Sequence, residues 1–153
     1  MSVYYLDTSA AVKLYVVETG SAWLRHQIET DQPPIVLSCA LLQVEIWSAF
    51  RRRLREGTVT EAEYTKMVNW FAEHCHALYR FVPVDETGIQ LAHELIDRHP
   101  LRAYDALHLA AASRVRSQLV DHSQSELLFL SADVQLNEAA SSEGLQVENP
   151  NEH

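Results

Sequence analysis

Residues 3–9 read VYYLDTS, and this stretch decides the fold. A short β-prone run at residues 3–6 ends in Asp7, and Thr8 and Ser9 can then cap a helix that we expect to reach about residue 17. Further strand patterns occupy residues 35–37, 78–82, 127–130 and 145–147, with helical patterns between them. This alternation predicts an α/β fold, in which helices cover both faces of a parallel sheet.

Capping residues and glycines predict where the helices begin and end. Ser38 can cap a long helix that ends before Gly57. Thr60 and Glu63 have the spacing of a capping box, which opens a helix to about residue 76. The other helices are expected at residues 21–29, 85–98, 102–119 and 133–143.

Size and composition predict a single domain. The chain has 153 residues, of which 47% are hydrophobic, and it shows no repeat or compositional break. We therefore assign residues 1–150 to one domain and residues 151–153 to a C-terminal tail. No apolar stretch is long enough to span a membrane, and the first residues lack the basic segment of a signal peptide. Two cysteines without Cys-x-x-Cys spacing are consistent with a reducing cytoplasm.

The charge of the chain limits how it could bind nucleic acid. Its 21 acidic residues outnumber 12 Lys and Arg, for a formal net charge of −9. This balance argues against binding by bulk attraction to phosphates, which requires Lys and Arg. It leaves room for an enzyme whose acidic centre is neutralised by metal ions.

Four acids interrupt otherwise apolar stretches, namely Asp7, Glu45, Asp105 and Asp133. A carboxylate is costly to bury unless a partner compensates its charge. Asp7 and Asp133 directly follow strands, at the edge where open α/β sheets bind ligands. Asp105 is expected in the first turn of its helix, and Glu45 two turns into its own. If the fold brings them together, these oxygens would suit a hard cation such as Mg²⁺ or Mn²⁺ rather than zinc.

Each candidate also has a purely structural explanation. Asp7 could form an Asx-turn, Asp133 could cap its helix, and Asp105 could complement the helix dipole. Only Glu45, among Leu, Val, Ile and Trp, has a poor structural explanation. His108 follows Asp105 by three residues, and a packed, hydrogen-bonded core histidine is the favoured interpretation.

The arginine cluster at residues 51–55 could be a solvated helix face or could bind the phosphates of a nucleic acid. Arg52 is seven residues from Glu45, which places it nearly in line on the same helix face, about 10 Å along the axis. We expect Arg52 and Arg55 to be the candidates for binding nucleic acid. Thr8 is a helix cap first, and its hydroxyl could also support the acidic site.

The chain resembles PIN-domain nucleases, particularly the VapC-like toxins of type II toxin–antitoxin pairs. Four motifs carry the resemblance, LDTSA at residues 6–10, VEI at 44–46, LRAYDALHLA at 101–110 and LSAD at 130–133. Each motif alone is weak, but together, in this order and spacing, they are specific. The resemblance implies a three-layer α/β/α fold with strand order 3-2-1-4-5, which would place Asp7 beside Asp133.

The resemblance also implies a function. In similar proteins the four acidic positions hold Mg²⁺ or Mn²⁺ and cleave RNA, and Ser131 stands where relatives carry a supporting hydroxyl. Asp7, Glu45, Asp105 and Asp133 are therefore expected as metal ligands and catalytic residues of a cytoplasmic endoribonuclease. We expect a homodimer that is inhibited by a cognate antitoxin. The alternatives are a housekeeping PIN nuclease in RNA processing and a catalytically idle binding module.

Overall fold

The computed structural model describes residues 2–122 and 126–153. All strand pairs are parallel, in the order β3-β2-β1-β4-β5. This arrangement confirms the predicted α/β fold and its strand order. The strands are β1 (Val3–Leu6), β2 (Ile35–Cys39), β3 (Tyr79–Val82), β4 (Leu127–Leu130) and β5 (Gln146–Glu148).

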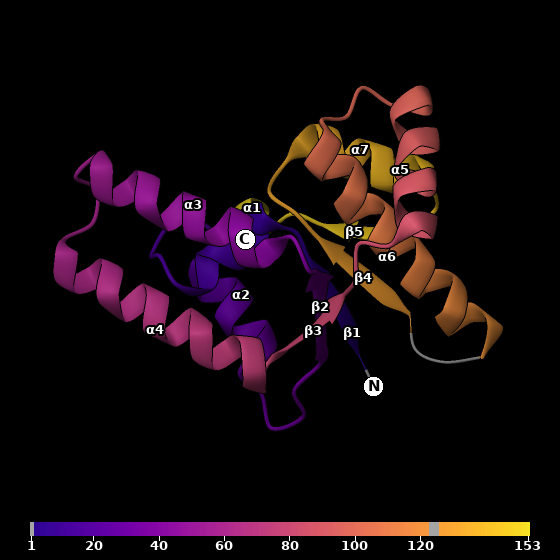
Figure 1. Cartoon of the computed structure of the whole chain (residues 1–153). Helices are drawn as coiled ribbons and strands as arrows, with labels where there is room; N and C mark the ends of the chain where they lie inside the picture. The colour runs from indigo at the N-terminus through magenta and orange to yellow at the C-terminus, as the bar shows by residue number, and fades with distance from the viewer. Residues whose placement is uncertain (1, 123–125) are drawn as a thin grey trace.

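Helices cover both faces of the sheet, as Figure 1 shows. One layer contains α1 (Thr8–Ala11), the 3-10 turn η1 (Val12–Leu14), α2 (Ser21–Ile28), α3 (Leu42–Arg55) and α4 (Glu61–Ala77). The other contains α5 (Glu86–Arg98), α6 (Ala103–Asp121) and α7 (Val134–Ser142). Because successive strand residues point to opposite faces, β1 supplies Leu6 to the first core and Val3 and Tyr5 to the second.

The central position of β1 sets where its carboxyl end lies. Val3 pairs with Ile35 of β2 on one side and with Leu127 of β4 on the other. The backbone N–H of Asp7 still donates to the Leu130 carbonyl, at 3.1 Å. The strand ends of β1 and β4 therefore lie together, as expected at a switch point in strand order.

Two helices differ from the sequence-based prediction in their ends or caps. The first helix ends at Ala11 rather than near residue 17, and its N-cap is Asp7. The third helix begins at Leu42, because Ser38 is the fourth residue of β2 and donates a hydrogen bond to the Leu6 carbonyl at 2.7 Å. Glu45 consequently lies in the first turn of α3, not two turns into it.

Other local signals are confirmed. Thr60 and Glu63 form the predicted capping box of α4, and α3 ends before Gly57. After β5, the 3-10 turn η2 (Pro150–Glu152) packs against Gly20, where any side chain would overlap the Pro150 carbonyl. Among the described residues, no helix is both long and apolar enough to cross a membrane.

Candidate active site

A pocket of about 610 Å³ opens where β1 and β4 end, and all four predicted acids line it. Asp7 and Asp133 come from the ends of these strands. Glu45 comes from the first turn of α3 and Asp105 from the first turn of α6. The pocket therefore gathers acids from both helical layers at the carboxyl edge of the sheet.

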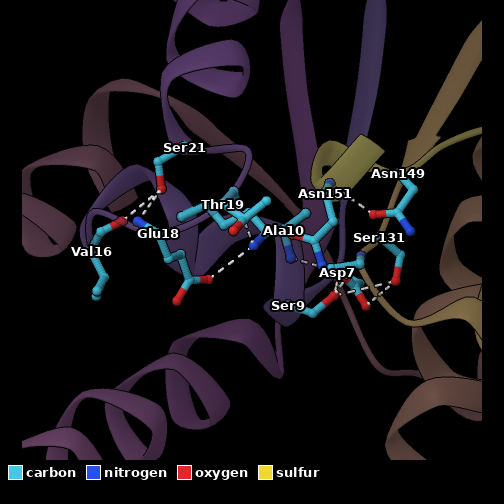
Figure 2. Close-up of polar contacts among 12 residues, drawn as sticks. Asp7, Ser9, Ala10, Val16, Glu18, Thr19, Ser21, Ser131, Asn149 and Asn151 are labelled. Carbon is cyan, nitrogen blue, oxygen red and sulfur yellow. Dashed lines mark hydrogen bonds and ion pairs between the residues drawn. The ribbon is translucent and has the colours of Figure 1, made fainter. Parts of the chain in front are cut away.

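Asp7 is the most deeply buried of the four acids, with 4% of its surface exposed. Its Oδ1 accepts hydrogen bonds from the Ser9 hydroxyl at 2.7 Å and the Ala10 N–H at 2.9 Å, and its Oδ2 accepts from the Ser131 hydroxyl at 2.7 Å (Figure 2). Burial raises the pKa of Asp7, while His108 and these hydrogen bonds lower it in part. Asp7 is thus both the cap of α1 and a pocket-lining carboxylate.

Two serines connect the strand that ends in Asp7 with the loop that carries Asp133. The Ser131 hydroxyl also accepts the Asp133 N–H at 3.1 Å, and the Ser9 hydroxyl accepts the Ala132 N–H at 2.9 Å. Asn137 donates to the Ser131 carbonyl at 2.7 Å. The loop after β4 is therefore fixed against the start of α1, so the position of Asp133 depends on that of Asp7.

Arg102 joins two of the acids. Its Nε donates to Asp105 Oδ2 at 3.1 Å, and a terminal nitrogen lies 3.7 Å from Asp133 Oδ2. The other oxygen of Asp133, Oδ1, accepts the Leu136 N–H at 3.1 Å and so caps α7. The guanidinium thus places a positive charge between two carboxylates that would otherwise repel each other.

Glu45 is held by a histidine from the opposite layer. Its Oε1 lies 2.7 Å from Nε2 of His108, which is buried, and Nδ1 of the same ring lies 2.9 Å from the Tyr5 hydroxyl. Thr8 contributes its hydroxyl 3.4 Å from His108 Nε2. The predicted buried histidine is therefore also a direct neighbour of a predicted site residue.

The acids line one pocket but do not converge on one point. Within residues 2–122 and 126–153, no three Asp, Glu, His or Cys side chains form a group that could hold a metal ion. Each carboxylate instead has local partners: serines at Asp7, His108 at Glu45, and Arg102 at Asp105 and Asp133.

The arginines of α3 are divided between two hollows. Arg52 and Arg53 line the acidic pocket, whereas Arg55 lines a neighbouring hollow with Trp47 and Arg51. Arg53 is engaged with Glu18 at 3.2 Å. Arg52 is exposed and makes no side-chain hydrogen bond or ion pair within the described part of the chain. It is therefore free to contact a bound anion.

Sequence reasoning missed three contacts with the acids. Ser9 was identified only as a helix cap, although it donates to Asp7. Arg102 was not identified as a partner of the acids, yet it is the N-cap of α6, and its side chain reaches Asp105 in the first turn of that helix. The contact between Glu45 and His108 had no local signal, because the two residues are 63 positions apart.

The comparisons with known proteins agree with this architecture. The family model of the PIN domain matches residues 4–133. Ribonuclease VapC45 and Ribonuclease VapC49 of Mycobacterium tuberculosis are each 36% identical over 116 residues, which is 75% of this chain and 78% of theirs. Ribonuclease VapC46 of the same species is 33% identical over 115 residues, again 75% of this chain and 78% of its own length. The chain therefore belongs to the PIN-domain family and is a VapC-like member of it.

Proposed function

We propose that this protein is a Mg²⁺- or Mn²⁺-dependent endoribonuclease toxin, with Asp7, Glu45, Asp105 and Asp133 as its metal-binding and catalytic residues. One observation carries the proposal: four carboxylates line a single pocket, and a cation, the Arg102 guanidinium, already lies between two of them. The names of the similar proteins, all ribonucleases, support RNA as the substrate.

The chemistry of the donor set fits a hard divalent cation. The four acids offer only oxygen ligands, which Mg²⁺ and Mn²⁺ prefer. The positively charged Arg102 guanidinium lies between Asp105 and Asp133. A metal ion can bind between these two acids only if the guanidinium gives up its ion pairs with them. Bound at these oxygens, the metal would supply the Lewis acidity that activates water for attack on a phosphodiester.

Basic side chains of the pocket suit a phosphate backbone. Arg52 lines the pocket and is exposed, and Arg102 has 83% of its side chain exposed. Once displaced from the acids, Arg102 can pair with a phosphate oxygen, as Arg does in many phosphate sites. Arg55 lines the neighbouring hollow instead, where it could contact a part of the RNA outside the acidic pocket. The basic charges are thus local, on a chain whose net charge is −9.

The toxin role, the antitoxin and the homodimer are parts of the same proposal. The similarity to VapC proteins supports them, since such toxins are expected to be cytoplasmic and paired with an inhibitor. Growth arrest on expression, rescued by Asp7→Asn, would distinguish a toxin from a housekeeping nuclease in RNA processing. A partner that occupies the acidic pocket should slow cleavage by the purified protein.

The proposal is tested by RNA cleavage with purified, partner-free protein in Mg²⁺ or Mn²⁺. We expect EDTA to abolish cleavage, and Asp105→Asn to reduce it by at least about 100-fold, because the substitution keeps the size of the side chain but removes the charge. Asp97→Asn, an exposed acid of α5, is the matched control and should leave the rate unchanged.

Two results would contradict the proposal. Cleavage that persists in EDTA would exclude a metal-dependent reaction. Cleavage by Asp105→Asn at the wild-type rate would mean that the activity comes from another site or from a contaminating nuclease.

A further inference from the structure

His108 is held at both ring nitrogens in a nearly sealed environment. Its exposed fraction is 1%, and that of Tyr5 is 0%. Nε2 faces Glu45 Oε1 at 2.7 Å, and Nδ1 faces the Tyr5 hydroxyl at 2.9 Å. The Tyr5 ring packs edge-on against the imidazole and stacks on Phe129, at centroid distances of 5.9 and 5.5 Å. A central strand therefore fixes the imidazole, and the imidazole contacts Glu45.

The proton positions in this chain of contacts follow from its two ends. An ionised carboxylate can only accept a hydrogen bond, so Nε2 of His108 carries the proton that faces Glu45. A tyrosine hydroxyl keeps its proton at neutral pH, so that of Tyr5 can donate to Nδ1, which lies 2.9 Å away. The contacts with Glu45 and with Tyr5 thus favour the same tautomer of His108, the one with its proton on Nε2.

This contact also joins the two helical layers. Glu45 belongs to α3, which packs in the core of one face of the sheet, whereas His108 belongs to α6, on the other face. In the described part of the chain the Glu45 carboxylate accepts no backbone hydrogen bond, unlike Glu63, which accepts the Thr60 N–H in the capping box of α4. The direction of the Glu45 carboxylate is therefore set by the side chains that reach it.

We propose that His108 is a positioning residue, which holds one oxygen of Glu45 through Nε2–H so that the other oxygen is presented to the metal site. This inference rests on the proposed function, because it assigns the role of Glu45 as a metal ligand. Imidazole–carboxylate pairs next to metal ligands are worth about 10–100-fold in metal affinity. The role adds to the packing of a core histidine and is separable from it.

Two substitutions of His108 separate the role from packing. Gln can place its amide N–H near the position of Nε2 and so keep the bond to Glu45. Asn can place its amide oxygen near Nδ1 and so keep the bond to Tyr5, but it cannot reach Glu45. Both remove the ring. We expect His108→Asn to weaken Mn²⁺ binding at least about tenfold and His108→Gln to restore most of the affinity.

The measurement is titration of the full-length protein with Mn²⁺ alone, followed by the electron paramagnetic resonance of free Mn²⁺. Urea unfolding in EDTA compares the stability of the two variants. In a Glu45→Gln background, the difference between His108→Asn and His108→Gln should disappear, because the group that His108 orients no longer binds metal. If His108→Asn and His108→Gln bind Mn²⁺ with equal affinity in the protein that keeps Glu45, the inference is overturned.

Tyr5→Phe covers the case in which His108→Asn does not fold. It removes one hydroxyl, leaves the ring stack and frees the imidazole to turn, so Mn²⁺ affinity should fall severalfold, and only when Glu45 is present. An unchanged affinity would overturn the inference on this variant too. If the wild-type protein binds no Mn²⁺, the proposed metal site itself is wrong, and that result is distinct from equal affinities of the variants.

Discussion

Arg102 holds together two acids that the proposed metal must bind. Its side chain is 83% exposed and pairs with Asp105 and Asp133. Exposed ion pairs of this kind contribute only about 0.2–1 kcal/mol each, so the guanidinium competes with a divalent cation but cannot exclude it. Arg102 can therefore pair with the two acids in the absence of metal and can be displaced from them when a metal ion binds.

Arg102→Gln should therefore bind Mn²⁺ more tightly, by up to about fivefold, because no ion pair must be broken first. Cleavage of RNA at saturating Mn²⁺ should nevertheless be slower if Arg102 contacts a phosphate. Calorimetric titration with Mn²⁺ and initial rates at saturating metal measure the two effects. The control is Arg98→Gln, which also removes an exposed arginine paired with a carboxylate, Glu143, outside the pocket. Weaker Mn²⁺ binding by Arg102→Gln would contradict the competition.

Asp7 lowers the stability of the metal-free protein at neutral pH. Burial raises its pKa in the folded state, so the unfolded chain ionises at a lower pH than the folded one. Stability is therefore lost as the pH rises from the ordinary pKa of an aspartate through the raised pKa of the folded state. A bound cation would remove this penalty.

Asp7→Asn should accordingly raise the free energy of unfolding in EDTA at pH 7, by about 1–3 kcal/mol, because a neutral amide avoids the cost of burying a charge, which the hydrogen bonds to Asp7 offset only in part. The amide oxygen can still accept from Ser9 and Ala10, so the cap of α1 is kept. Urea unfolding measures the change, and Asp97→Asn should show none. A destabilised Asp7→Asn protein would mean that Ser131 requires a carboxylate as its acceptor.

At the scale of elements, local signals predicted most of the fold. The capping box at Thr60, the glycines after α3 and α7, and the strand patterns identified helices and strands to within a few residues. Ser38 misled the prediction, because a serine suits a helix cap and a buried strand position equally well from sequence. Its bond to the Leu6 carbonyl depends on the neighbouring strand.

The candidate site was predictable in its acids and not in their partners. Asp7 and Asp133 could be placed because they follow strands, and Asp105 because it lies in the first turn of a helix. The bonds from Ser131 to Asp7 and from His108 to Glu45 span 124 and 63 positions of the chain. Such contacts arise from the assembled sheet, so no periodicity in the sequence reports them.

One aromatic cluster links α4 to the segment after η1 and to β3. Trp70 donates its indole N–H to Nε2 of His74 at 2.9 Å, and Nδ1 lies 2.8 Å from the Tyr15 hydroxyl, which is 2.9 Å from that of Tyr79. A proton on Nε2 of His74 would face the indole N–H. Burial lowers the pKa of His74, and this outweighs the opposing influence of Glu73 and Glu29.

Acidification should therefore weaken the docking of α4. Because the folded-state pKa of His74 lies below that of the unfolded chain, the unfolded state takes up the proton first, and stability falls as the pH drops below about 6.5. We expect the urea midpoint to fall more between pH 7.5 and 5.5 in the wild type than in His74→Gln, which does not titrate. His26→Gln, an exposed histidine of α2, should behave as the wild type. Parallel pH profiles for wild type and His74→Gln would contradict this role.

At the scale of the whole molecule, the acidic pocket couples metal binding to folding. The acids converge on a pocket only when β1, β4, α3 and α6 are assembled, so the unfolded chain has no comparable site. A metal that binds the folded state alone stabilises it by RT ln(1 + [L]/Kd). The formal net charge of −9 adds a general repulsion that a divalent cation reduces.

Mn²⁺ at about one hundred times its dissociation constant should thus add about 2.7 kcal/mol of stability. For a chain of this size that raises the melting temperature by about 5–10 °C. Calorimetry in matched ionic strength separates this effect from screening, since Na⁺ at equal ionic strength should give a much smaller shift. Asp7→Asn is the informative comparison, because it should melt higher than the wild type in EDTA and gain little from Mn²⁺. As Mn²⁺ is added, the difference in melting temperature between the two proteins should therefore shrink or change sign. An equal rise in melting temperature for both proteins would place the metal outside this pocket.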